Sequence, residues 1–121
     1  MTQKKNLSAK SRGKSFAYAF NGLAQLIKQE PNARIHAIVT IAVIIAGFAK
    51  HINRWQWVAL FFAIGLVWIT EALNTCIEEL CNFSCENKWH PAIKTIKDIS
   101  AAAVLIAAIV SVGVGIIVFF C

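Results

Sequence analysis

Three long apolar runs constrain the fold of this chain more than any other feature, and they cover residues 35–49, 55–73 and 99–120. A membrane-spanning helix needs about 20 residues to cross about 30 Å of hydrocarbon, with about 17 as the lower bound. The second and third runs reach this length, and the first reaches it when its polar flanks snorkel. The composition agrees, because only 15% of the residues are charged, against about 25% in a typical soluble domain. The sequence therefore predicts a single all-α integral membrane domain with transmembrane helices at 34–50, 55–82 and 95–121.

The distribution of basic residues predicts the orientation. Ten of the twelve Lys and Arg residues lie before the first run or between the second and third. Cytoplasmic segments carry an excess of such residues. We therefore expect a cytoplasmic N-terminus and second connection, with the first connection and the C-terminus outside. The first 15 residues are polar and basic, without the apolar centre of a cleavable signal peptide.

The segment before the first run has two parts. Residues 1–13 form a basic tail, and residues 14–30 carry apolar side chains at spacings of three and four. This spacing predicts an amphipathic helix that is too polar on one face to span a bilayer. Such a helix lies in the membrane interface. The apolar positions are Phe16, Ala19, Phe20, Leu23, Leu26 and Ile27.

Two carboxylates and an amide form a polar stripe at the end of the second run. At roughly 100° per residue, Glu71, Asn74 and Glu78 fall within about 60° of one another on a helix. A carboxylate next to lipid is costly, by at least about 2.5 kcal/mol at mid-membrane. We therefore interpret the stripe as a polar site at the cytoplasmic membrane boundary. A carboxylate just inside that boundary gains basicity by desolvation, so Glu71 could take a proton from a lipid hydroxyl.

Three more charged residues should lie near the same membrane surface: Glu30, Lys97 and Asp98. Mg²⁺ is commonly held by one or two carboxylates together with substrate phosphates, and lysines bind phosphate oxygens as compact charges. A structural alternative is that Glu71 and Glu78 pair with Lys94 and Lys97 only to hold the helices together. Spacing alone does not decide between these two interpretations.

Other patterns in the chain do not predict a further catalytic or binding site. Gly13-Lys14-Ser15 imitates the end of a phosphate-binding loop, but Ser8 stands where that loop needs its first glycine. The cysteines at 76, 81 and 85 have no second pair to complete a zinc site. No platform of interleaved basic and aromatic residues suggests nucleic acid as a partner. Small residues recur every fourth position at Ala103, Ala107, Ser111 and Gly115, a pattern typical of close helix packing or oligomerisation in lipid.

The sequence resembles the small prokaryotic diacylglycerol kinase family, which includes the undecaprenol kinases. The resemblance runs from about Lys14 to the end of the chain. Four segments carry it in order, at residues 18–22, 30–36, 71–78 and 90–105. The most specific part is the combination of E-x-x-N-x-x-x-E at residues 71–78 with K-D-x-x-A-x-A-V-L at residues 97–105.

The resemblance implies an ATP- and Mg²⁺-dependent lipid kinase of the bacterial inner membrane, acting as a homotrimer with composite sites at the cytoplasmic face. It assigns Glu71 as proton acceptor and Asn74 as its polar partner. Glu30 and Glu78 would hold metal on the ATP phosphates. The remaining nucleotide contacts implied by the family are Tyr18, Trp89, His90, Lys97 and Asp98. A non-catalytic membrane scaffold or small transport subunit is the alternative function.

Two positions depart from the pattern of the family. Asn82 stands where an Asp usually follows the second motif glutamate, and Trp89 stands where a Tyr usually precedes the histidine. The segment Arg34-Ile35-His36 is closer to the undecaprenol kinase branch than to members specific for diacylglycerol. The sequence therefore favours undecaprenol as the acceptor, with diacylglycerol as the alternative.

Overall fold

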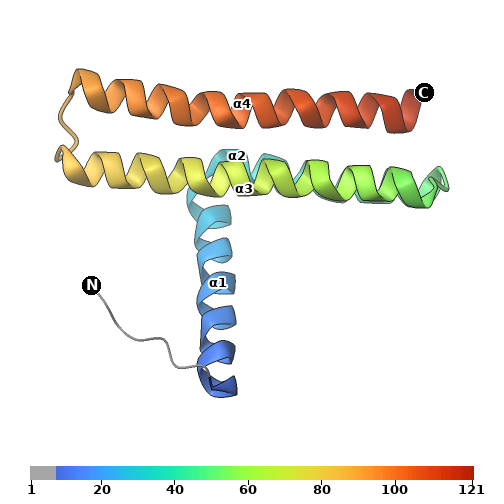
Figure 1. Ribbon diagram of the computed structural model, residues 1–121, viewed down its shortest axis with the longest axis horizontal. Coiled ribbons are helices and arrows are strands. Elements are labelled where there is room, and N and C mark those ends of the chain that lie inside the picture. Colours follow the sequence, from blue (N-terminus) through green and yellow to red (C-terminus); the bar gives the residue numbers. More distant parts are fainter. Residues whose placement is uncertain (1–7) are drawn as a thin grey trace.

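The computed structural model describes residues 8–121, which form four helices. Helix α1 covers Ala9–Gln29, α2 covers Pro31–Ala49, α3 covers Arg54–Ser84 and α4 covers Pro91–Phe120. Helices α2, α3 and α4 run side by side, whereas α1 turns away from them (Figure 1). The prediction of an all-α membrane protein with three spans is confirmed, because α2, α3 and α4 are each long and apolar enough to cross a bilayer.

The helices begin and end at local signals that hydropathy does not show. Helix α1 begins at Ala9 rather than residue 14, because the Ser8 hydroxyl accepts a hydrogen bond from the Ser11 amide and caps the first turn. The predicted basic tail lies partly in residues 1–7, outside the described residues. Helix α4 begins at Pro91 rather than residue 95, since Pro occupies its first position and Nδ1 of His90 accepts from the Ala92 amide.

Helix α3 is longer than a bilayer requires. It starts with a capping box, in which Asn53 and Gln56 each accept a hydrogen bond from the other's backbone amide. It then continues to Ser84, and a turn with left-handed backbone at Glu86 and Asn87 leads into α4. At roughly 1.5 Å per residue, α3 extends about 20 Å past Glu71.

Polar contacts join α3 to α4 along their whole length. Near the α2–α3 connection Gln56 Nε2 donates to the Val118 carbonyl at 3.3 Å, and in the middle Ser111 Oγ donates to the Ala63 carbonyl at 3.0 Å. Helix α2 is tied to the opposite side of α3 by Trp68 Nε1, which donates to Thr40 Oγ1 at 3.0 Å. These bonds fix the register of the helices, so the polar ends of α2, α3 and α4 come to one level.

Candidate functional site

The buried centre of the site is the Glu71 carboxylate. Its residue is 1% exposed, and neither carboxylate oxygen accepts a hydrogen bond from residues 8–121. The nearest ionic partner is His36 on α2, whose Nε2 lies 3.7 Å from Glu71 Oε2. A buried carboxylate without hydrogen bonds is costly to maintain, so packing alone does not account for it.

Asn74 connects the second carboxylate of the stripe to α4. Its Nδ2 donates to Glu78 Oε1 at 3.3 Å, and its Oδ1 accepts from Ser100 Oγ at 2.8 Å. Both Asn74 and Ser100 are buried. The three side chains of the predicted stripe, called the acidic edge below, therefore have different partners: Asn74 joins Glu78 to Ser100 of α4, and Glu71 lies near His36 of α2.

Glu30 stands at the corner between α1 and α2, close to the acidic edge. Partial burial raises the pKa of its carboxyl group above the ordinary value of 4.5, and the negative charges of Glu78, Glu71 and Glu79 raise it further. Arg34 fixes this corner, because its Nε and Nη2 donate to the carbonyls of Ile27 and Lys28 at the end of α1. The fold thus brings Glu30 to the carboxylates of α3.

The lysine and aspartate of α4 have separate surroundings. Lys97 Nζ donates a hydrogen bond to Asn82 Oδ1, one helical turn past Glu78. Lys94 Nζ pairs with Asp98 Oδ2 at 2.6 Å on the exposed surface. No ion pair joins Lys94 or Lys97 to Glu71 or Glu78 in the described part of the chain. Residues 8–121 therefore give no support to the alternative in which these groups pair only to hold the helices together.

Three of the predicted nucleotide contacts lie away from this centre. Tyr18 on α1 and Trp89 in the α3–α4 connection are largely exposed, at 73% and 75%. His90 is exposed and caps the start of α4. None of the three forms a hydrogen bond with another predicted site residue within residues 8–121.

The residues present fit a divalent cation bound together with phosphate. The pKa of Glu30 is raised first by burial and then by the negative charges of Glu78, Glu71 and Glu79, and a cation would relieve the repulsion between these charges. Glu78 has one oxygen held by Asn74, which leaves the other free. Within residues 8–121 no group of three or more His, Cys, Asp or Glu side chains is gathered closely enough to hold a metal unaided. Such a site needs ligands from the nucleotide, as Mg²⁺ sites commonly do.

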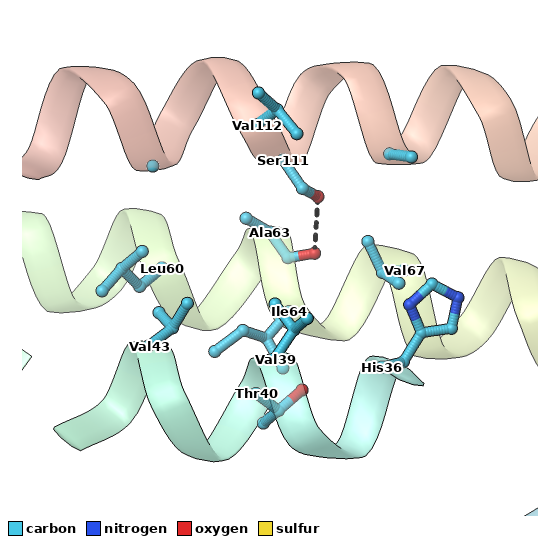
Figure 2. A pocket seen from close by; sticks show the side chains of 12 residues that line it. His36, Val39, Thr40, Val43, Leu60, Ala63, Ile64, Val67, Ser111 and Val112 are labelled. Carbon is cyan, nitrogen blue, oxygen red and sulfur yellow. Dashed lines mark hydrogen bonds between the residues drawn. The ribbon is translucent and has the colours of Figure 1, made fainter. Parts of the chain in front are cut away.

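Two of the hollows near the acidic edge differ in their lining. One, of about 290 Å³, lies between α2, α3 and α4 and is lined almost entirely by apolar side chains, with His36 at one end (Figure 2). No carboxylate or lysine lines it. The other, of about 760 Å³, lies between α1 and α3, and Thr75 and Glu79 line it. The Thr75 hydroxyl is buried there without a hydrogen-bond partner among the described residues.

Sequence reasoning missed His36, Thr75 and Ser100 as contributors to the site. His36 and Ser100 lie inside the motif segments that carried the resemblance, but only the helix register shows what they touch. Thr75 follows Asn74 directly and faces α1 instead of α4. Each of these contacts depends on tertiary packing, which spacing along one helix does not contain.

A membrane-embedded helical bundle with a buried acidic edge at one end is the architecture of an integral-membrane enzyme rather than of a soluble one. The model of the family described as prokaryotic diacylglycerol kinase matches residues 17–119. The chain therefore belongs to the prokaryotic diacylglycerol kinase family. The prediction of a lipid kinase is confirmed at this level, and the scaffold alternative is set aside.

Two relatives show how the chain relates to individual kinases. It is 35% identical over 106 residues to the undecaprenol kinase of Bacillus subtilis (strain 168), a match that covers 88% of this chain and 85% of the relative. It is 37% identical over 101 residues to the diacylglycerol kinase of a Synechocystis species (strain ATCC 27184 / PCC 6803 / Kazusa). That match covers 84% of this chain but 58% of the relative.

Proposed function

We propose that this protein transfers the γ-phosphoryl group of ATP to the hydroxyl of undecaprenol at the cytoplasmic face of the bacterial inner membrane. The observation that carries the proposal is the Glu71 carboxylate, which is almost fully buried and accepts no hydrogen bond from any of the described residues. A carboxylate in this state is available to accept a proton at the membrane boundary. Undecaprenol is preferred over diacylglycerol because the match to the undecaprenol kinase covers most of that relative.

In the proposed reaction the lipid hydroxyl oxygen attacks the γ-phosphorus while its proton passes to Glu71. A new O–P bond forms, the bond between the γ-phosphorus and the bridging oxygen breaks, and ADP leaves with that electron pair. Phosphoryl transfer needs mainly positioning and charge neutralisation from the protein. Lys97 carries a positive charge beside a neutral amide, so that charge is available for phosphate oxygens.

Glu30 and Glu78 are the residues that would hold Mg²⁺ on the ATP phosphates. The bound cation would neutralise phosphate charge. Asn74 orients Glu78 by donating to one of its oxygens. Asp98, Tyr18, Trp89 and His90 are proposed nucleotide contacts on the family resemblance, and all four are exposed to an approaching nucleotide.

The lipid alcohol would approach along the hollow between α1 and α3, where the Thr75 hydroxyl, one turn past Glu71, has no hydrogen-bond partner in residues 8–121. This places α1 in the membrane interface, an arrangement supported by its exposed Phe16 and Phe20 and by its course away from the spans (Figure 1). Assembly as a homotrimer is proposed on the family resemblance alone, because Ser111 in the ridge of small residues on α4 already bonds to α3 of the same chain.

Replacing Glu71 by Gln tests the role of proton acceptor. The amide keeps the size of the side chain but cannot take the proton, and a general base contributes at least roughly a hundredfold in rate. We expect Glu71→Gln to lower kcat by about that factor in vesicles supplied with ATP, Mg²⁺ and undecaprenol. The protein should elute at the same oligomeric size as the wild type.

Glu86→Gln is the matched control, because Glu86 is exposed at the α3–α4 turn and its ion pair within the described part of the chain is with Lys88, at 3.9 Å. It should retain the wild-type rate. An unchanged rate in Glu71→Gln would exclude Glu71 as the base. Competition between undecaprenol and diacylglycerol in the same vesicles measures the acceptor preference, and preferential labelling of diacylglycerol would overturn the choice of undecaprenol.

A further inference from the structure

We propose that Ser100 is a positioning residue that fixes the orientation of the Asn74 amide and, through it, the Glu78 carboxylate. Ser100 stands outside the predicted set of site residues, one turn past the start of the Lys97-Asp98 pair on α4. The inference rests on the proposed function, since it assigns Ser100 to the Mg²⁺ and nucleotide end of that site.

The hydrogen bonds run in one direction from α4 to the acidic edge. The Ser100 hydroxyl donates to Asn74 Oδ1 at 2.8 Å, and Asn74 Nδ2 donates to Glu78 Oε1 at 3.3 Å. The carboxylate can only accept, so the amide must turn its nitrogen toward Glu78 and its oxygen toward α4. Ser100 is the group that satisfies this oxygen.

The hydrogen bond from Ser100 to Asn74 matters because both side chains are buried. Asn74 is 9% exposed and Ser100 is 7% exposed, and a buried acceptor without a donor is unfavourable. No other side-chain donor within residues 8–121 reaches Asn74 Oδ1. Without the Ser100 hydroxyl, the Asn74 amide can rotate so that its oxygen accepts a hydrogen bond from a penetrating water. Its nitrogen then no longer donates to Glu78 Oε1. The free Glu78 oxygen would then no longer be held in a defined place for metal.

Ser100→Ala tests the inference with a readout that general packing does not move. The variant should need roughly tenfold more Mg²⁺ for half-maximal activity in vesicles, as is typical when a partner of a metal ligand is lost. Its kcat at saturating Mg²⁺ should fall less. Ser100→Thr keeps the hydroxyl and should restore the wild-type Mg²⁺ requirement. The added methyl group has room, because Ser100 lines a hollow of about 350 Å³ between α3 and α4.

Ser111→Ala is the matched control, since Ser111 lies on the same helix and also donates to α3, at the Ala63 carbonyl. It should leave the Mg²⁺ requirement unchanged. The inference is overturned if Ser100→Ala lowers only thermal stability, or if both serine variants raise the Mg²⁺ requirement equally.

A spectroscopic readout separates this inference from the proposed function. In protein labelled with ¹⁵N-asparagine, the side-chain amide signal of Asn74 is assigned by its loss in Asn74→Gln. It should shift or broaden in Ser100→Ala, but not in Ser111→Ala. A wild type inactive on every lipid alcohol would defeat the proposed function while this signal still tests Ser100. An Asn74 signal unchanged by Ser100→Ala would overturn the role of Ser100.

Discussion

At the scale of single residues, Glu30 shows how the site concentrates negative charge. Partial burial and the carboxylates of Glu78, Glu71 and Glu79 raise its pKa above 4.5. Between the ordinary and the raised pKa the folded chain binds more protons than the unfolded chain. The free energy of unfolding therefore decreases as pH rises through this window, and the penalty is fully present above the raised pKa.

Glu30→Gln should remove this penalty. In detergent without Mg²⁺, we expect the variant to have a higher Tm than the wild type at about pH 7 and the same Tm at about pH 4, where the carboxyl group is protonated. Thermal unfolding at the two pH values measures the effect. Mg²⁺ should raise the Tm of the wild type more than that of the variant. A Tm increase that is equal at both pH values would mean that charge is not its origin.

At the scale of helices, Gly47 sets how closely α2 approaches α3. A Cβ added at Gly47 would lie 2.7 Å from Cη2 and 2.9 Å from Cζ2 of Trp57. The indole cannot easily withdraw, because it packs on Phe48 with ring centroids 4.8 Å apart. Only a residue without a side chain allows this hairpin to close.

Gly47→Ala should therefore destabilise the fold by about 1–3 kcal/mol through overpacking. Gly65→Ala is the matched control. Gly65 lies on α3, and a Cβ added there would meet nothing within 4 Å. We expect the control to be neutral or slightly stabilising, since Ala is the better helix former. Denaturant or thermal unfolding in a fixed detergent compares the two variants. Equal stability of both would show that the hairpin tolerates a wider spacing.

The three spans could be predicted from sequence because hydropathy measures how favourably each residue transfers from water into lipid, which decides whether a helix spans the membrane. The exact ends could not, since they depend on single hydrogen bonds at Ser8 and His90 and on Pro91. The acidic stripe on α3 was also predictable, because the helical period puts Glu71 and Glu78 on one face. The bond from Ser100 was not, because it depends on the register between α3 and α4.

At the scale of the whole molecule, the bundle buries few apolar side chains between its own helices. Large apolar side chains on the spans remain exposed, such as Ile38 at 68% and Phe61 at 76%. Lipid tails solvate such surfaces, so burial between helices is not needed to satisfy them. The polar contacts between helices, which occur along the whole length of the bundle, therefore matter for stability and for the register of the helices.

The length of α4 and the positions of two cysteines allow the orientation of the bundle in the membrane to be tested. Helix α4 spans 30 residues, or about 45 Å at roughly 1.5 Å per residue, which exceeds the hydrocarbon thickness of about 30 Å. Its two ends must therefore face opposite compartments. Cys85 caps the end of α3 at the connection to α4, and Cys121 follows the other end of α4. The predicted orientation puts Cys85 in the cytoplasm and Cys121 outside.

Two variants that retain a single cysteine, at position 85 or 121, test this orientation in intact cells. A membrane-impermeant maleimide should label Cys121, which is exposed, and should leave Cys85 unlabelled until the membrane is permeabilised. Permeabilised cells are the control, because both thiols should react there. Labelling of Cys85 in intact cells would place the acidic edge outside, where the cell provides no ATP. The proposed phosphoryl transfer to a membrane alcohol would then lose its donor, whatever the chemistry of Glu71.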